Sequence, residues 1–146
     1  MGVKIIKPED TFEIRKKVLR ENIPLPYEFP GDYDESTVHF GYFIKDELVS
    51  VATILKSSHD YFHQKNQYQL RGMATLVEYQ GNQIGSKLLT EILHFLVNKN
   101  AEILWFNARI KALNFYQKLG FQTIGEEFDI NYVGGHYVMF KYLKQN

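Results

Sequence analysis

Cysteine is absent from this chain of 146 residues. Disulfide bonds, a thiol nucleophile and zinc sites built from thiolates are therefore excluded. A chain without disulfides suits a reducing compartment, so we expect the protein to be cytoplasmic.

The chain also lacks a surplus of charge and any long hydrophobic run. Its 17 Lys and Arg balance 17 Asp and Glu, whereas a nucleic-acid-binding protein needs a basic surplus for phosphate contacts. No apolar run approaches the roughly 20 residues of a membrane-spanning helix. The first residues, Met1 to Lys4, do not begin a signal peptide. We therefore expect neither nucleic acid nor a membrane as a partner.

Enough apolar residues are present for one folded domain. Hydrophobic residues make up 45% of the chain and aromatic residues 15%. A domain of this length buries about two-thirds of the surface that its unfolded chain exposes. We expect a single domain over residues 1–146, present as a monomer or a homodimer.

The chain is organised around one stretch, Tyr79 to Leu89. An extended apolar segment, residues 67–77, precedes it. Apolar residues at helical spacing begin within it and continue beyond it, at Ile84, Leu88, Leu89, Ile92 and Leu96. A strand thus leads into a helix through a short turn that has two glycines and no acidic residue. Free N–H groups and the positive end of the helix dipole make such a turn suitable for a phosphate or pyrophosphate.

This turn does not match the common nucleotide-binding loops. A Walker loop needs Lys and then Ser or Thr after its second glycine, but Gly85 is followed by Ser86 and then Lys87. A Rossmann fingerprint needs a glycine two residues after Gly81, and that position holds Gln83. A different nucleotide-binding protein remains a weak alternative.

Periodicity and turn residues predict alternating strands and helices. Strands are predicted over residues 3–6, 38–44, 48–55, 67–77, 103–106, 121–128 and 132–143, and helices from residue 8, over about 16 residues after the central turn, and over 111–119. The strands at 38–44 and 48–55 are predicted to form an antiparallel hairpin. The strand–helix–strand order around the central turn predicts that the strands at 67–77 and 103–106 are parallel neighbours.

Charged and histidine side chains outside the turn allow two interpretations each. The basic residues Arg15, Lys16, Lys17 and Arg20 are predicted to form a solvated helix face. The loop that follows has no Lys or Arg, and it interleaves acidic with aromatic residues (Glu28, Asp32, Asp34 and Glu35; Tyr27, Phe29 and Tyr33). It is either a polar surface loop or an acceptor loop that attracts a cationic amine. His59 and His63 have a spacing that a metal could use, but no third ligand is evident and no metal site is predicted.

Three sequence blocks resemble the GNAT family of N-acetyltransferases. The first, Leu70 to Thr75, resembles the family's fourth strand, where a bulge exposes backbone groups. In the second, Gln80 and Gly85 match the family motif Gln/Arg-x-x-Gly-x-Gly/Ala, with Gln83 in place of the usual first glycine. The third, Phe115 to Phe121, matches Phe-Tyr-x-Lys-Leu-Gly-Phe. The resemblance covers the whole chain and implies an α/β (α+β) GNAT fold, with a mixed, mostly antiparallel sheet of six to seven strands flanked by about four helices.

The resemblance also implies an activity and a cofactor site. The protein would transfer an acetyl group from acetyl-coenzyme A (acetyl-CoA) to a small-molecule or peptide amine, without a metal. The acetyl and pantetheine groups would meet the backbone of Met73, Ala74 and Thr75. The pyrophosphate would bind the turn mainly through N–H groups, so the Gln83 side chain only has to point away; the turn residues are Gln80, Gly81, Asn82, Gln83, Ile84, Gly85 and Ser86. Arg109 stands where the family often has an asparagine, and would be a weaker cofactor contact.

Two side chains are candidates for proton transfer. Tyr116 matches the family's general acid toward the departing thiolate. Proton transfer from a phenol with a pKa near ~10 to a thiolate with a pKa near ~8.5 is unfavourable by only about 2 kcal/mol. Some family members have a glutamate base where this chain has Leu104, so His136 is the leading candidate for the base. Core packing for Tyr116 and a hydrogen bond to a neighbouring loop for His136 are the structural alternatives.

Two questions about function stay open at this point. Glu126, Glu127 and Asp129 lie in the last inter-strand region, which borders the acceptor site in the family, as does the acidic loop. Together these regions predict a cationic acceptor. The second question is catalysis itself, because the departures at Gln83, Leu104 and Arg109 also fit a non-catalytic acyl-CoA sensor or regulatory module.

Overall fold

The strands form one mixed sheet in the order β1-β2-β3-β4-β5-β7-β6. The computed structural model describes residues 2–143. The strands are β1 (Gly2–Ile6), β2 (Val38–Ile44), β3 (Glu47–Lys56), β4 (Gln67–Thr75), β5 (Ile103–Arg109), β6 (Gln122–Ile130) and β7 (Gly134–Tyr142). Neighbouring strands are antiparallel except for β4 and β5, which are parallel. The predicted hairpin, the parallel pair and the seven-stranded mixed sheet are confirmed.

Helical segments connect these strands. The first begins as a 3-10 turn (Pro8–Thr11), continues as α1 (Phe12–Ile14) and ends as a π-helical turn (Arg15–Leu19). The others are α2 (Ile84–Asn98) and α3 (Leu113–Lys118), which 3-10 turns at Val77–Tyr79 and Ile110–Ala112 precede. Residues 2–143 thus hold three α-helices where about four helices were predicted.

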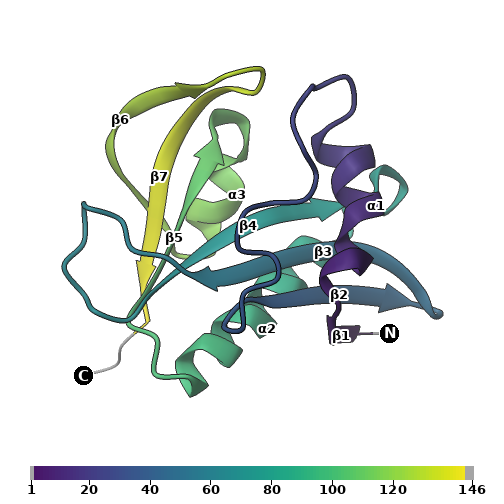
Figure 1. The fold of residues 1–146 in the computed structure, drawn as a ribbon, viewed down its shortest axis with the longest axis horizontal. Coiled ribbons are helices and arrows are strands. Elements are labelled where there is room, and N and C mark those ends of the chain that lie inside the picture. The colour runs from purple at the N-terminus through teal and green to yellow at the C-terminus, as the bar shows by residue number, and fades with distance from the viewer. Residues whose placement is uncertain (1, 144–146) are drawn as a thin grey trace.

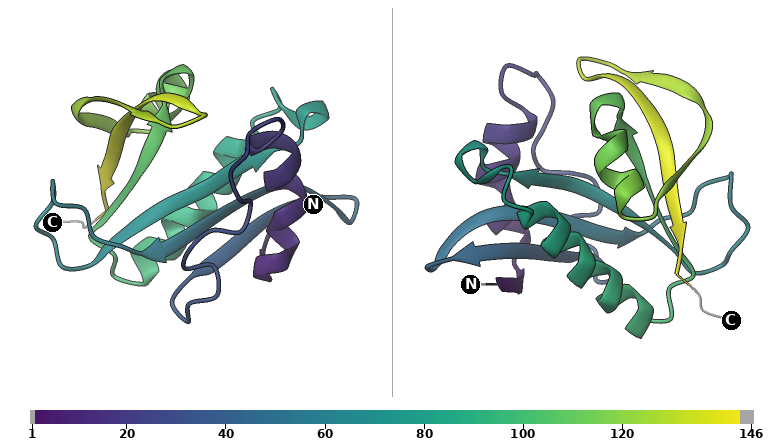
Figure 2. Two further views of the ribbon diagram at one scale, coloured as in Figure 1. Left: turned by 45° about the horizontal axis from the view of Figure 1, so that its top comes forward. Right: turned by 180° about the vertical axis from the view of Figure 1, so that it is seen from behind.

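The helices cover opposite faces of the sheet. The predicted apolar face of α2 is buried against Leu70 of β4 and Leu104 of β5, and α3 packs onto the same core. On the other face, Ile14 of α1 packs against Ala74 of β4 and Val51 of β3. Seen from behind, α2 and α3 lie in front of the sheet and α1 lies beyond it (Figure 2). We call these the α2 face and the α1 face.

The two parallel strands separate soon after they pair. Only Gln67, Tyr68 and Gln69 of β4 are in register with β5, opposite residues 103–105. Beyond these residues β4 and β5 diverge (Figure 1). The carboxyl ends of both strands are therefore free of each other, and the space between them can be lined from both faces of the sheet.

Arg15 corrects the prediction of a solvated basic face on the first helix. Its side chain has no exposed surface and forms an ion pair with Asp32 of the following loop at 2.7 Å. The guanidinium also donates to the Thr53 hydroxyl at 2.9 Å. A buried arginine needs a partner for its charge, and the acidic loop supplies one. Asp32 is therefore not available to attract a cationic acceptor.

Candidate active site

A cleft of about 1060 Å³ lies where β4 and β5 separate. It gathers nearly all of the predicted site residues: Met73, Ala74, Thr75, Gln80, Gly81, Gln83, Ile84, Gly85, Ser86, Arg109, Tyr116 and His136. Asn82 belongs to the same turn but does not line the cleft. Residues far apart in the chain therefore meet at a place that their sequence separation does not reveal.

The turn before α2 presents free N–H groups to this cleft. Gly81 and Gln83 have positive φ angles of 86° and 63°, an alternation that points successive N–H groups into one concavity. Within residues 2–143 the N–H groups of residues 81–86 find no acceptor, and the first turn of α2 has no acidic residue. The Gln83 side chain is exposed. These features fit an anion held by backbone groups at a helix N-terminus.

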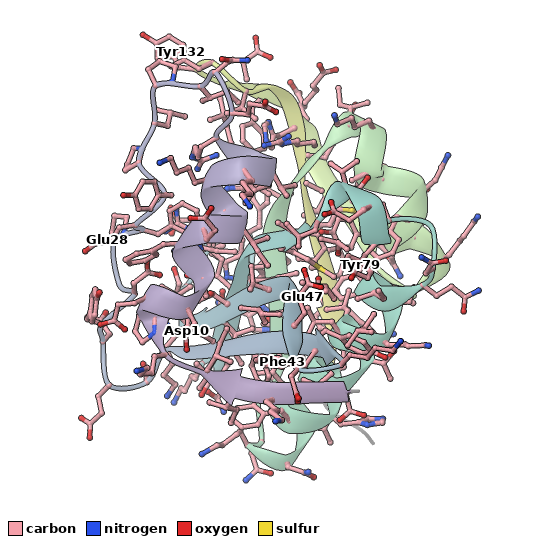
Figure 3. The ribbon with its side chains drawn as sticks, turned by 90° about the vertical axis from the view of Figure 1, so that its right-hand side faces the viewer. Asp10, Glu28, Phe43, Glu47, Tyr79 and Tyr132 are labelled. Atoms are coloured by element: carbon pink, nitrogen blue, oxygen red, sulfur yellow. The ribbon has the colours of Figure 1, made fainter. Side chains whose placement is uncertain are left out.

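Gln80 lines the cleft and also forms a hydrogen bond that holds the turn in place. Its side-chain amide donates to the Thr75 carbonyl oxygen at 2.9 Å. Close by, the Tyr79 hydroxyl donates to Glu47 at 2.9 Å, and the two side chains lie together in Figure 3. These contacts fix the turn against the ends of β4 and β3, and the turn is thereby held in place before any ligand arrives.

A bulge on β4 forms the floor of the cleft. Val51 of β3 pairs with Ala74 and Thr53 with Arg71, so two β4 residues stand opposite one β3 residue. Gly72 has a φ of 62°, the left-handed conformation that a bulge with glycine in its first position requires. This confirms the predicted bulge in the fourth strand, which interrupts the ladder at Gly72 and Met73.

Tyr116 of α3 reaches this bulge from the α2 face. Its hydroxyl lies 3.8 Å from the Met73 sulfur, and its ring packs against Phe106 with centroids 4.4 Å apart. Burial raises the pKa of Tyr116 to about 12, although the charge of Arg109 opposes the rise. The hydroxyl therefore stays protonated at neutral pH. Full proton transfer from Tyr116 to a thiolate with a pKa near ~8.5 is therefore unfavourable by about 5 kcal/mol.

His136 of β7 reaches the same cleft from the α1 face. The ring is buried and stacks on Phe128 with centroids 5.8 Å apart. Its Nδ1 lies 2.7 Å from the Gly134 carbonyl oxygen. A carbonyl oxygen only accepts, so Nδ1 carries the hydrogen and Nε2 keeps its lone pair in the neutral ring. No protein group in the described residues hydrogen-bonds Nε2, which leaves it free to accept a proton. The bond is made within β7, to Gly134 two residues earlier, and not to a neighbouring loop, and it orients the ring.

Three arginines line the cleft, and one of them is the neighbour of His136. Arg109 is the cross-strand partner of His136, and partners in register place their side chains on one face. Arg71 of β4 and Arg20, after the first helix, line the same cleft. Burial lowers the pKa of Arg20, and the charges of Arg109, Arg71 and Arg15 lower it further.

The Phe29 ring is the platform on which three guanidinium groups pack. Its ring lies 4.0 Å from Arg15, 4.8 Å from Arg71 and 5.3 Å from Arg20, measured from the ring centroid to the guanidinium carbon. The ring edge also packs directly on Gly72, where an added Cβ would stand 2.9 Å from it. Arg20, Arg71 and Phe29 were not predicted as site residues. Arg71 is the single charged residue of β4, and this was the available signal for it.

The charge of the cleft does not favour the predicted cationic acceptor. Among its lining residues, Glu21 is acidic and six are basic: Lys17, Arg20, Arg71, Arg109, Lys111 and Lys118. Glu28 points away from the sheet into solvent (Figure 3), and Asp34 and Glu35 are exposed outside the cleft. Of the acidic residues in this loop, Asp32 is therefore buried, and Glu28, Asp34 and Glu35 lie on the surface.

Comparisons with known proteins agree with this geometry. Residues 7–121 match the Acetyltransferase (GNAT) family. The chain belongs to the GNAT family. It is 37% identical over 145 residues to the uncharacterized N-acetyltransferase YitI of Bacillus subtilis, covering 99% of this chain and 97% of the relative. The protein is therefore an acyltransferase of a family that uses acetyl-CoA.

Solved GNAT structures share its architecture. Escherichia coli ElaA superposes with a TM-score of 0.80 at 20% identity, covering 96% of this chain and 98% of that one. An aminoglycoside 6'-N-acetyltransferase solved with coenzyme A superposes with a TM-score of 0.75 at 13% identity, covering 100% and 99%. At these identities the likeness establishes the GNAT fold, with its seven-stranded mixed sheet.

Other sequence candidates lie outside this GNAT cleft. His59 packs against Trp105 and Tyr61 instead of pairing with His63 as a metal site. No group of three or more metal-binding side chains occurs among residues 2–143. None of the helices in that range is long and apolar enough to cross a membrane.

Proposed function

We propose that this GNAT protein transfers an acetyl group from acetyl-CoA to the amino group of an acceptor that also carries an anionic group. The observation that carries the proposal is the meeting of three features in one cleft. These are free N–H groups at the start of α2, the Tyr116 hydroxyl on the α2 face, and Nε2 of His136 beside arginines on the α1 face. Acetyl-CoA supplies an acetyl group already activated as a thioester.

The turn and the β4 bulge would hold the cofactor. N–H groups of residues 81–86 would bind its pyrophosphate, and the positive φ of Gln83 keeps that side chain out of the way. Asn82, which does not line the cleft, would contribute only backbone. Backbone groups of Met73, Ala74 and Thr75 would align the pantetheine arm along β4. Arg109 lies on the face opposite α2, so we assign it to the acceptor and not to a phosphate of the cofactor.

Tyr116 would act as the general acid. Its proton stays in place at neutral pH because burial raises its pKa to about 12. The hydroxyl lies at the bulge, beside Met73. Transfer of the Tyr116 proton to the cofactor sulfur costs about 5 kcal/mol and becomes feasible only as the sulfur becomes basic. Tyr116 therefore keeps its proton until the thiolate departs.

His136 would act as the general base. A lysine-like amine is neutral only about once in 2,500 molecules at pH 7, so a group must accept its proton. The Gly134 carbonyl fixes the ring with Nε2 as the acceptor. A neutral imidazole nitrogen with a lone pair can accept that proton.

The arginines would bind the anionic part of the acceptor. Arg20, Arg71 and Arg109 line the cleft, Arg109 lies next to His136, and Glu21 is the one acidic side chain among the cleft's lining residues. Guanidinium groups recognise carboxylates and phosphates through paired hydrogen bonds. An amino acid or an aminoalkyl phosphate has the required amine and anion within a few bonds.

Replacement of the tyrosine tests this function. Tyr116→Phe should lower kcat by about 10²- to 10⁴-fold, the usual contribution of a general acid, while the Kd for acetyl-CoA changes little. Thiol release from acetyl-CoA and calorimetric binding measure the two quantities. Tyr142→Phe, at an exposed position outside the cleft, is the matched control. Binding of acetyl-CoA without turnover of any amine in the parent protein would contradict the proposal and favour a non-catalytic acyl-CoA-binding module.

A further inference from the structure

Arg71 of β4 is a charged side chain without an ion-pair partner. It is half-buried and lines the cleft. Among residues 2–143, its guanidinium forms no ion pair with a carboxylate and donates no hydrogen bond. Burial lowers the pKa of Arg71, and the charge of Arg15 lowers it further, while the charge of Asp32 acts in the opposite direction. A partly desolvated charge without a partner is costly, so the guanidinium has N–H groups to offer to a ligand.

The Phe29 ring supplies a contact that stabilises this guanidinium. The ring centroid lies 4.8 Å from the guanidinium carbon of Arg71. A cation over an aromatic face is attracted by the charge distribution of the ring, and the attraction grows when water is excluded. Phe29 is only 7% exposed and lines the same cleft. The ring has no hydrogen-bond acceptor atom, so it stabilises the charge of Arg71 and leaves the N–H groups available for an anion.

Phe29 is itself fixed by three contacts. Its backbone N–H donates to the Asp32 carboxylate at 2.8 Å. Its ring lies 4.0 Å from the guanidinium carbon of Arg15, which forms the buried ion pair with Asp32. The ring edge packs on Gly72, in the β4 bulge, where an added Cβ would stand 2.9 Å from it. The core ion pair and the bulge therefore set the position of the ring before any ligand arrives, and a group positioned in advance binds its ligand at a lower cost in entropy.

The cluster around Phe29 has more positive than negative charge. The guanidinium carbons of Arg15, Arg71 and Arg20 all lie within 5.3 Å of the ring centroid. Asp32 is paired with Arg15, and among residues 2–143 no carboxylate forms an ion pair with the other two. Arg20 donates to two backbone carbonyl oxygens, whereas Arg71 keeps all of its donors. A carboxylate or phosphate at Arg71 would supply the missing negative charge.

We propose that Phe29 is a positioning residue that determines the affinity of the cleft for the anionic group of the acceptor. Its ring holds the Arg71 guanidinium at the wall of the cleft with the N–H groups free to bind a carboxylate or phosphate. Because Phe29 acts through Arg71, its effect on the reaction appears in KM and not in kcat. The inference rests on the proposed function for the acceptor that carries the anion, but anion binding can be measured without turnover.

Binding of O-phosphoserine without acetyl-CoA, measured by calorimetry, tests this role. Phe29→Leu should raise the Kd about tenfold, as expected for the loss of a cation–π contact in a partly desolvated site. In the acetylation reaction the same variant should raise the KM for O-phosphoserine by a similar factor and change kcat by less than about twofold. Phe12→Leu is the matched control, because it removes a ring that packs on Tyr27 outside the cleft; it should leave both quantities unchanged.

A double-mutant cycle distinguishes a positioning role from a purely structural one. If Phe29 acts through Arg71, Phe29→Leu should change the Kd by less than about twofold when Arg71→Gln is already present. A trifluorinated phenylalanine in place of Phe29 keeps the shape of the ring and weakens the negative charge of its face, so it should raise the Kd about threefold even if the leucine variant does not fold. Equal factors in both backgrounds, or an unchanged Kd with the fluorinated ring, would overturn the proposal.

Failure of this inference and failure of the proposed function give different results. A parent protein that binds O-phosphoserine but acetylates no amine would contradict the proposed function alone, and the effect of Phe29 on anion binding would stand. A parent protein that acetylates O-phosphoserine with the same KM as its Phe29→Leu variant would contradict the inference alone. A parent protein that does not bind O-phosphoserine would overturn the inference.

Discussion

Arg15 and Asp32 show how a single charged pair can fix a loop beside an active site. The guanidinium holds the carboxylate through two hydrogen bonds, at 2.7 and 3.1 Å, and also donates to the Tyr27 carbonyl oxygen. Asp32 in turn accepts the Phe29 N–H at 2.8 Å. His39 accepts from the Thr53 hydroxyl and donates to the Asp32 carbonyl. The loop that carries the Phe29 platform is thus tied to β2 and β3.

We predict that Asp32→Asn lowers the free energy of unfolding by about 3–5 kcal/mol, because it leaves the buried Arg15 charge without a partner. Chemical denaturation at pH 7 measures the loss. Asp34→Asn, at an exposed position in the same loop, should change stability by no more than about 0.5 kcal/mol. Similar losses in both variants would show that the ion pair is not the cause.

The same pair makes stability depend on pH. Burial alone raises the pKa of Asp32, but hydrogen bonds from Arg15 and the Phe29 N–H, with the Arg15 charge, more than offset it and leave the pKa lowered. Because the pKa of Asp32 is lower in the folded protein than in the unfolded chain, where it is near ~3.9, the ionised carboxylate stabilises the fold at pH values above ~3.9. This stabilisation is lost as the pH falls further and Asp32 becomes protonated. The parent protein should therefore lose more stability below about pH 4 than Asp32→Asn does, as denaturation midpoints measured across this pH range would show.

The turn into α2 shows at the scale of an element why a motif can tolerate a substitution. Gln83 replaces a family glycine yet holds the left-handed conformation that a glycine would take, with φ at 63°. An L-residue in this region costs about 1–2 kcal/mol relative to its usual conformations. The contacts of Gln80 and Tyr79 hold the turn in that shape, so the N–H groups point at the cleft regardless of the side chain.

We predict that Gln83→Gly stabilises the protein by up to about 1 kcal/mol, because glycine adopts a positive φ without strain. The Kd for acetyl-CoA should change by less than about threefold, since the backbone does the binding. Gln83→Pro is the contrasting variant: proline fixes φ near −65° and removes an N–H, so the affinity should fall about tenfold or more. Thermal unfolding and calorimetry measure both. A large loss of affinity in the glycine variant would assign the binding to the Gln83 side chain.

Over the whole molecule, a neutral chain gathers basic side chains around one cleft. The cleft has six basic side chains against one acidic. The sheet separates the helix dipole of α2 from the arginines, so the cofactor and the acceptor would approach from opposite faces. A net charge of zero therefore says little about the field at the site.

We predict that acceptors with an anionic group are preferred: O-phosphoserine should have a higher kcat/KM than serinamide, and lysinamide the lowest. Arg71→Gln should raise the KM for O-phosphoserine about 10- to 100-fold, the effect of losing one to two charge-assisted hydrogen bonds worth about 1.5–3 kcal/mol in all. Its effect on serinamide should be small. Lys65→Gln, exposed and outside the cleft, is the control. Preference for lysinamide in the parent protein would contradict the assignment of the arginines.

The sequence by itself predicted the elements and the turn before α2, and its resemblance to the GNAT family named two candidates for proton transfer. Helical spacing at Ile84, Leu88 and Ile92 and two glycines in a short turn are local signals, and local backbone geometry decides whether N–H groups are free. Tertiary structure decided which charges are available. Arg15 and Arg20 lie in one basic cluster in the chain, yet the first is buried against Asp32 and the second faces the cleft. Pairing between distant residues sets burial and charge, and a one-dimensional pattern does not contain it.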